Sequence, residues 1–353
     1  MPTQSTKQLH VFVATPLSDE HARLIESLEP RVKLILDHDL LPPVRWPSDH
    51  TGDPAFKRSP QQQARFEELR NRADALYGVP DESPAQLADA EAANPRLRWV
   101  QTMAAGGGAT VRAAGLSEAD LARVAFTTAA GVHAPRLAEF ALLGALAGLK
   151  DVARLQRLMA ARTWAERWVM GTLHGCSVLI VGLGHIGRET ARVFSLLGAD
   201  VVAVNRSPRQ AAGVRATYPV EWLPDVIGQA DIIVCALPQA VGTDQLVSAA
   251  ALARMQPGAI FVNVGRGTSV DEAALIEALQ DGRIGYAALD VVRVEPLPAD
   301  SPLWTFDNVL ISPHTAATSD TEDRQIAELF ADNATRLLDG RELRNVVDPV
   351  LFY

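Results

Sequence analysis

The 353-residue sequence predicts an α/β protein with two domains, each built on a mostly parallel β-sheet covered by helices. Three observations lead to this fold class. The chain is longer than one ordinary hydrophobic core needs. Short apolar runs alternate with helical patterns in two separate stretches. Between these stretches, residues 135–163 are rich in Ala and Leu and predict one long helix with Pro135 in its first turn.

The first stretch contains short runs of the apolar and β-branched residues that favour strands. A helical pattern follows the first run and ends before Pro30, and the Pro- and Asp-rich residues 41–60 are typical of a surface loop. The expected strands are LHVFVA (9–14), VKLILD (32–37), DALYGVP (74–80) and LRWVQTM (97–103).

The second stretch has longer and more apolar runs, which are typical of strands inside a parallel sheet covered on both faces. After His314 the pattern is helical again over residues 319–340. The expected strands are SVLIVGLG (177–184), ADVVAVN (199–205), ADIIVCALP (230–238), GAIFVNVG (258–265), AALDVV (287–292) and NVLISPH (308–314).

Composition excludes several classes of protein. The net charge of −9 opposes binding to polyphosphate backbones, so we expect no nucleic-acid partner. Cys176 and Cys235 lie in apolar runs and are expected to be buried thiols, with neither a disulfide framework nor a metal site. The N-terminus lacks a signal-peptide pattern, and the apolar run 140–149 is too short to cross a bilayer. We therefore expect a cytoplasmic protein without membrane contact.

A glycine motif supplies the first functional signal. Gly182, Gly184 and Gly187 form G-x-G-x-x-G after a predicted strand and at the start of a predicted helix. Such glycines permit a tight turn, a close approach of the backbone to a pyrophosphate and close packing of helix on strand. The N–H groups at the helix start then favour the phosphate charge. The motif predicts a Rossmann-like dinucleotide site, although a turn that merely needs glycine remains the alternative.

The end of the next strand indicates which dinucleotide is preferred. An acidic residue there would bind the free ribose 2′-hydroxyl of NAD. This chain instead has Asn205, Arg206 and Ser207, and Asp200 lies at the wrong end of the strand. Arg206 could pair with a 2′-phosphate, which predicts NADP as the preferred cofactor, with NAD as the second choice. The alternative is a solvated surface arginine.

Arg266, Glu295 and His314 each follow a strand-like run and could meet at the carboxyl edge of one sheet. Arginine suits a carboxylate and a carbonyl that gains negative charge. Histidine can supply a proton, and a nearby carboxylate favours its charged form. Taken singly, each residue has an ordinary structural explanation. Together they suit the reduction of a small 2-oxo acid, in which hydride arrives at the 2-carbon and a proton at the new oxygen.

The ordered motifs of the chain resemble those of the D-isomer-specific 2-hydroxyacid dehydrogenases. This family includes glyoxylate/hydroxypyruvate reductases, D-lactate dehydrogenases and phosphoglycerate dehydrogenases. The resemblance covers almost the whole chain and implies an NAD(P)-dependent oxidoreductase, of the glyoxylate/hydroxypyruvate reductase type. The matching stretches are LHGCSVLIVGLGHIGRETA, ALPQAVGTDQLV, ALARMQPGAIFVNVGRGTSVDEAALIEAL, GYAALDVVRVEPLP and NVLISPHTA.

The resemblance assigns roles to single residues of this chain. The family's catalytic arginine, glutamate and histidine fall on Arg266, Glu295 and His314. Asp290 matches an aspartate near the nicotinamide, and Thr243 matches a threonine near the cofactor phosphate. Further cofactor contacts are expected, by the same resemblance, at His185, Ile186, Leu237, Pro238, Val264, Gly265, Arg266 and Ala316.

The resemblance also implies a discontinuous substrate domain. Residues 1–131 would form its first part, residues 132–315 the dinucleotide-binding domain, and residues 316–353 a return to the substrate domain. The family pairs through the cofactor domain, and the apolar segment 135–163 has more hydrophobic surface than one face needs. We therefore expect a homodimer.

One loop departs from the family. The loop that holds the substrate carboxylate reads TMAAGGGAT here, at residues 102–110. Ala105 and Gly106 match the residues whose amides would bind the carboxylate, and Gly108 replaces the usual acid. Backbone donors need no particular side chain, so carboxylate binding is still expected. The three consecutive glycines predict a more flexible loop.

Three other functions are compatible with parts of the sequence. Formate dehydrogenases of the same superfamily pair their histidine with glutamine, whereas this chain has Glu295. A phosphoglycerate dehydrogenase remains open, although the segment after His314 is too short for the regulatory domain that many of them carry. A dinucleotide-sensing co-repressor would keep the same three residues, but this chain has no long disordered tail for recruiting partners.

Overall fold

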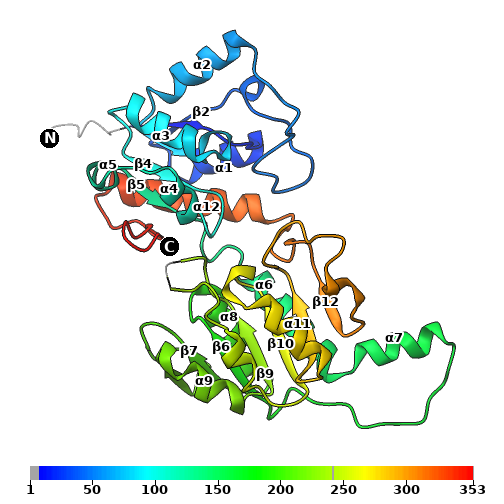
Figure 1. The fold of residues 1–353 in the computed structure, drawn as a ribbon. Coiled ribbons are helices and arrows are strands. Elements are labelled where there is room, and N and C mark those ends of the chain that lie inside the picture. The colour runs from blue at the N-terminus through cyan, green and yellow to red at the C-terminus, as the bar shows by residue number, and fades with distance from the viewer. Residues whose placement is uncertain (1–7, 241, 353) are drawn as a thin grey trace. The chain divides into compact units, whose positions relative to one another are not determined.

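A computed structural model describes residues 8–240 and 242–352 of the chain. It has two compact units, Met1–Val132 with Thr318–Tyr353, and His133–Ala317. Each unit contains one β-sheet in which every described strand pairing is parallel (Figure 1). The predicted α/β fold class is therefore confirmed.

The first unit has five strands in the order β2-β1-β3-β4-β5. Its strands are β1 (Leu9–Val13), β2 (Val32–Ile35), β3 (Ala75–Tyr77), β4 (Trp99–Gln101) and β5 (Ala125–Thr127). Its helices are α1 (Asp19–Leu28), α2 (Pro60–Arg70), α3 (Pro84–Ala93), α4 (Gly108–Ala113), α5 (Glu118–Arg123) and α12 (Glu322–Leu338), with 3-10 turns at His38–Leu40 and Pro80–Glu82.

Helix α12 belongs to the first unit, although about 190 residues separate it from β5 in sequence. It packs beside α1 (Figure 1). The ring of Phe330 stacks on Trp99 at 4.5 Å and meets the edge of Tyr77 at 5.1 Å between centroids. All three rings are fully buried, and each such aromatic pair adds about 1 kcal/mol to the burial of its area. These contacts pack α12 against strands of the first sheet.

The second unit has seven strands in the order β12-β11-β10-β9-β6-β7-β8. Its strands are β6 (Ser177–Val181), β7 (Asp200–Val204), β8 (Ala216–Tyr218), β9 (Ile232–Cys235), β10 (Ala259–Asn263), β11 (Ile284–Leu289) and β12 (Val309–Ile311). Its helices are α6 (Ala134–Leu149), α7 (Val152–Ala160), α8 (His185–Leu196), α9 (Leu223–Val226), α10 (Ala249–Leu252) and α11 (Glu272–Gln280), with 3-10 turns at Val220–Trp222, Ile227–Gln229, Gly267–Ser269 and Pro302–Thr305.

Two separate cores cover the two faces of the second sheet. Val178 and Ile180 of β6 face the core that includes α6 and α8, whereas Leu179 and Val181 face the core under α9, α10 and α11. The alternation follows from the strand period of two. Because both faces are covered, strands of this sheet are apolar at successive positions, as the sequence predicts.

The prediction of one long helix over residues 135–163 is wrong. Helix α6 ends at Leu149 and α7 begins at Val152, because Asp151 adopts a left-handed backbone with φ 52°. The carboxylate of Asp151 accepts a hydrogen bond from the N–H of Arg154 and so caps the second helix. The expectation for the thiols is half correct, since Cys235 is buried whereas Cys176 is partly exposed.

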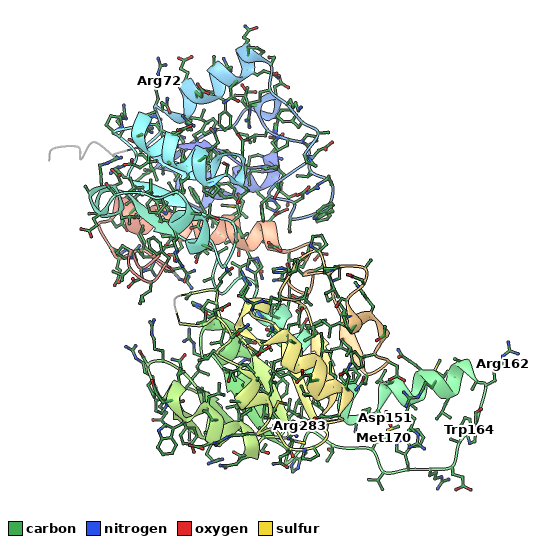
Figure 2. All side chains as sticks on the ribbon, viewed as in Figure 1. Arg72, Asp151, Arg162, Trp164, Met170 and Arg283 are labelled. Carbon is green, nitrogen blue, oxygen red and sulfur yellow. The ribbon has the colours of Figure 1, made fainter. Side chains whose placement is uncertain are left out.

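Helix α7 and the segment after it form an arm, residues 151–171, that projects from the body of the second unit. Figure 2 shows the arm running out from Asp151 to Arg162 and Trp164 and back to Met170. Its return is fixed by Gly171, whose N–H donates to the carbonyl of Leu149 at 2.8 Å. None of the described helices is long and apolar enough to cross a membrane.

Glu82, in the 3-10 turn after β3, has an unusual environment. Its backbone is left-handed, with φ 48°, and its Oε1 is buried with no hydrogen-bond partner among the described residues. Burial raises the pKa of Glu82 from 4.5 to about 7, although the charge of His50 opposes the shift. The folded state therefore favours the protonated side chain. Because the pKa is raised by folding, the protonated Glu82 side chain stabilises the folded state fully below pH 4.5. This stabilisation is lost as the pH rises towards 7.

We predict that Glu82→Gln raises the free energy of unfolding at pH 8, by about 3 kcal/mol at most. The neutral amide avoids the cost of a buried charge, so the gain should shrink towards zero near pH 4.5. Urea unfolding of both proteins at several pH values measures the difference. A gain of the same size at every pH would contradict a titrating Glu82.

Candidate active site

The residues predicted to form the site, except Ala105 and Gly106, lie in the second unit, most of them at one edge of its sheet. Because the strands are parallel, their carboxyl ends share that edge, where open α/β sheets bind ligands. The segments that follow β6, β7, β9, β10, β11 and β12 there carry Gly182–Gly187, Asn205–Ser207, Leu237 and Pro238, Val264–Arg266, Asp290 with Glu295, and His314–Ala316.

His314 and Glu295 form the central pair of this edge. Nδ1 of His314 lies 2.7 Å from Oε2 of Glu295, and Oε1 of Glu295 accepts a hydrogen bond from the N–H of Val292 at 3.2 Å. The His314 side chain is 44% exposed, so its ring is accessible to a small molecule. Since Nδ1 is bound to the carboxylate, Nε2 is the nitrogen left to act on a ligand.

The backbone of His314 is held in the left-handed region, with φ 54°. For a residue with a side chain this conformation costs about 1–2 kcal/mol. The cost is offset by hydrogen bonds from its N–H to the carbonyls of Asp290 at 3.0 Å and Ser312 at 2.9 Å. The carboxylate of buried Asp290 accepts two more, from the N–H groups of Thr315 at 3.1 Å and Ala316 at 3.0 Å. Asp290 therefore fixes the loop that carries His314.

Arg266 follows β10 and is mostly withdrawn from solvent. Its Nη1 donates to the carbonyl of Gly265 at 2.8 Å. Burial lowers the pKa of Arg266, and the charges of Glu295 and Asp290 raise it. An arginine stays charged under such opposing effects. The site thus contains one guanidinium cation beside an imidazole–carboxylate pair.

The glycine motif has the geometry of a phosphate-binding turn. Gly182 has φ 98°, and a Cβ on Gly187 would lie 2.0 Å from the carbonyl oxygen of Gly182. By contrast, a Cβ on Gly184 would meet no atom within 4 Å. The first backbone bond into α8 is made by Arg188, so the preceding N–H groups of the helix point out of it. Donors and open space coincide here, and both fit a dinucleotide phosphate.

Asn205 has a structural task that the sequence did not predict. Its Oδ1 accepts a hydrogen bond from the N–H of Leu183, inside the glycine motif, at 3.2 Å. Its Nδ2 donates to the carbonyl of Ser207 at 3.0 Å. The amide therefore joins the glycine loop to the turn that presents Arg206 and Ser207, which are both exposed.

Thr243 holds its own loop together. Its hydroxyl accepts from the N–H of Ala240 at 2.9 Å and lies 2.8 Å from the carbonyl of Pro238. Pro238 is exposed, whereas Leu237 packs into the core. A Cβ on Gly265 would lie 2.5 Å from the carbonyl oxygen of Leu237, so the loops after β9 and β10 touch backbone to backbone.

Ala105 and Gly106 lie in the first unit, in the loop between β4 and α4. Their N–H groups have no acceptor among the described residues. One glycine of this loop makes a close contact: a Cβ on Gly107 would lie 1.8 Å from Oγ1 of Thr102. A residue larger than glycine at position 107 would clash with Thr102. This steric reason for a glycine is separate from the flexibility that the sequence predicts for the loop.

Two buried polar residues beside Arg266 were not predicted from the sequence. Asn263 and Ser269 are each 1% exposed, and both donate hydrogen bonds to the carbonyl of Arg266. A signal was present for Asn263, because it is the one polar residue of the strand run AIFVN. A polar side chain at the carboxyl end of an apolar strand indicates a loop or site contact.

Comparison with known proteins identifies the class. Residues 142–316 match the family description "D-isomer specific 2-hydroxyacid dehydrogenase, NAD binding domain". Glyoxylate/hydroxypyruvate reductase B of Yersinia pestis (strain Pestoides F) is 35% identical over 209 residues, which span 58% of this chain and 64% of that protein.

Two solved structures are similar over nearly the whole chain. A D-isomer specific 2-hydroxyacid dehydrogenase from Xanthobacter autotrophicus Py2, in complex with NADPH and MES, is 29% identical with a TM-score of 0.76, covering 97% of this chain and 98% of that one. An NADPH-dependent glyoxylate/hydroxypyruvate reductase from Sinorhizobium meliloti, in complex with NADP and sulfate, is 26% identical with a TM-score of 0.76, covering 98% and 100%.

The fold and the matched domain define an NAD(P)-binding oxidoreductase. The chain belongs to the D-isomer specific 2-hydroxyacid dehydrogenase family, as its motifs indicate.

We predict that Gly187→Ala and Gly184→Ala separate folding from cofactor binding. Gly187→Ala should lower the free energy of unfolding by about 1–3 kcal/mol, because its Cβ meets backbone. Gly184→Ala should leave stability nearly unchanged and weaken NADPH and NADH binding alike, because its Cβ enters the space before α8. Urea unfolding and fluorescence titration measure the two effects. Equal stability losses would contradict the described turn.

Proposed function

We propose that this enzyme is an NADPH-preferring reductase of short 2-oxo acids, of the glyoxylate/hydroxypyruvate type. The observation that carries the proposal is the bond between Nδ1 of His314 and Glu295, which leaves Nε2 of an accessible imidazole for an acid–base step. The names of relatives from Yersinia pestis and Sinorhizobium meliloti support the choice of substrate.

In this proposal each group acts at one atom of the substrate. A nicotinamide cofactor, when bound, would supply the hydride that C2 receives. Nε2 of protonated His314 gives its proton to the carbonyl oxygen, and Glu295 stabilises the imidazolium. The fixed charge of Arg266 binds the carboxylate and the oxygen that becomes negative. In the oxidative direction the same nitrogen takes the proton from the hydroxyl group.

The free N–H groups of Ala105 and Gly106 suit a second contact with the substrate carboxylate. They have no acceptor among the described residues, so a bound carboxylate would satisfy both. Cofactor contacts are proposed at the glycine motif with His185 and Ile186, at Asn205–Ser207, Leu237, Pro238 and Thr243, at Val264–Arg266, and at Asp290 and Ala316.

A panel of 2-oxo acids tests the proposed substrate. Glyoxylate, hydroxypyruvate, pyruvate and 3-phosphohydroxypyruvate are compared by kcat/KM with NADPH and with NADH. The proposal expects glyoxylate or hydroxypyruvate to lead. A preference for the phosphorylated acid would favour a phosphoglycerate dehydrogenase instead, and dinucleotide binding without turnover would favour a sensor.

We predict that His314→Ala lowers kcat by roughly 10²–10⁴-fold and leaves NADPH affinity within about twofold. The reason is that the variant loses the proton donor but no group assigned to the dinucleotide. Steady-state kinetics and fluorescence titration measure the two quantities. Turnover close to the parent value would exclude His314 as the acid–base.

We predict a higher kcat/KM with NADPH than with NADH. Asn205 carries no charge that would repel a 2′-phosphate, and Arg206 has a geometry suited to it. Arg206→Ala should erode the preference mainly by weakening NADPH, with NADH kinetics little changed. Arg254→Ala, another exposed arginine of the same unit, serves as the control. An NADH-favouring parent enzyme would contradict this assignment.

We also propose a homodimer, formed through the second unit. The arm exposes apolar side chains that its own unit does not cover, among them Met159 at 77%, Trp164 at 100% and Val169 at 97%. Exposed apolar surface of this kind marks an interface. The proposed partner is a second copy of this chain.

We predict a dimer by light scattering at micromolar concentration, and a shift towards monomer in Trp164→Glu. A charge at the centre of a buried interface has a large desolvation cost. Leu196→Glu, at an exposed apolar position outside the arm, should leave the parent mass unchanged. A monomeric parent protein would refute the proposal.

A further inference from the structure

The backbone of Arg266 is anchored by an unusual number of hydrogen bonds. Its carbonyl oxygen accepts from Nδ2 of Asn263 at 3.2 Å, from Oγ of Ser269 at 2.6 Å and from the N–H of Ser269 at 3.2 Å. Both side chains are 1% exposed. The side chain of Arg266 can still change rotamer, but these hydrogen bonds restrain the backbone from which it extends.

Asn263 binds the loop on two sides. Besides its bond to Arg266, its Oδ1 accepts from the N–H of Gly265 at 3.0 Å, so one amide spans the whole turn. The backbone of Asn263 extends the connection, because its carbonyl accepts from the N–H of Asp290 at 3.0 Å. Asp290 in turn accepts from the N–H of His314. A continuous set of hydrogen bonds therefore joins the Arg266 loop to the His314 loop.

We propose that Asn263 and Ser269 are positioning residues for the reaction: they fix the backbone of Arg266 and thereby the place of its guanidinium group relative to His314. The inference rests on the proposed function, in which Arg266 binds the 2-oxo acid. It adds two residues that never touch the substrate.

The physical reason is the cost of leaving a buried polar group unpaired. Shifting the carbonyl of Arg266 would break bonds to both side chains inside the protein, at about 1–3 kcal/mol for each group left without a partner. The loop is thereby restricted to one arrangement. A misplacement of about 1 Å at a binding group can cost roughly 100-fold in rate.

The experiment compares Asn263→Ser with a matched control, Asn94→Ser. Both asparagines are 1% exposed, and each accepts from the N–H two residues on and donates to backbone carbonyls. Serine can still accept from Gly265 but cannot reach the carbonyl of Arg266. Asn94 lies in the first unit, away from the proposed site residues in sequence.

We expect Asn263→Ser to lower kcat/KM for the 2-oxo acid roughly tenfold or more, mainly through KM, with NADPH affinity within about twofold. Ser269→Ala should act in the same direction with a smaller effect, because Asn263 would still bind the loop at both Arg266 and Gly265. Asn94→Ser should lose stability in urea and keep kcat/KM within about twofold. An unchanged kcat/KM in Asn263→Ser would overturn the inference.

A double-mutant cycle with Arg266→Ala separates positioning from general damage to the fold. If Asn263 acts through Arg266, then Asn263→Ser should cause no further loss of kcat/KM once the guanidinium group is absent. The same loss in both backgrounds would show a merely structural role and overturn the inference. Full activity of Arg266→Ala alone would instead overturn the proposed function, on which the inference depends.

Discussion

The constraint on which this molecule depends is the parallel direction of the strands in its second sheet. Parallel strands bring every carboxyl end to the same edge, so residues separated by more than 100 positions in sequence reach one surface. Gly182 follows β6 and His314 follows β12 at that edge. Helices cover both faces because consecutive parallel strands need crossover connections, which are usually helical. Apolar strands bury those faces and leave the edge free for polar groups.

At the edge, contacts between backbones set the geometry. A Cβ on Gly187 would meet the carbonyl of Gly182, and one on Gly265 would meet that of Leu237. These loops pack so closely that glycine is required. Polar side chains then bind the loops together, as Asn205 does for the glycine turn and Asp290 for the segment after His314. The loops that carry the proposed site residues are thus held in place by polar neighbours.

Some predictions from the sequence were wrong because a single residue, or the tertiary environment of a segment, overrode the short-range pattern. The Ala- and Leu-rich segment 135–163 has helical composition throughout, yet Asp151 takes a left-handed conformation and divides it. Strands β5 and β8, which were not predicted, have three residues each and depend on pairing with β4 and β7. Cys176 lies in an apolar run and is nevertheless partly exposed, because it precedes the strand.

The sequence by itself determined the fold class, most of the strands and the glycine turn, and it supplied the residues proposed for hydride and proton transfer. These depend on local patterns: apolar period, glycine spacing and a polar residue at a strand end. Only the tertiary structure decided that Nδ1 of His314 faces Glu295, that the carboxylate of Asp290 is engaged by the backbone after His314, and that Asn263 anchors Arg266. Each of these contacts joins two loops or two parts of one loop. The atoms come within hydrogen-bonding distance only after the strands have paired and the loops have packed closely at their glycines.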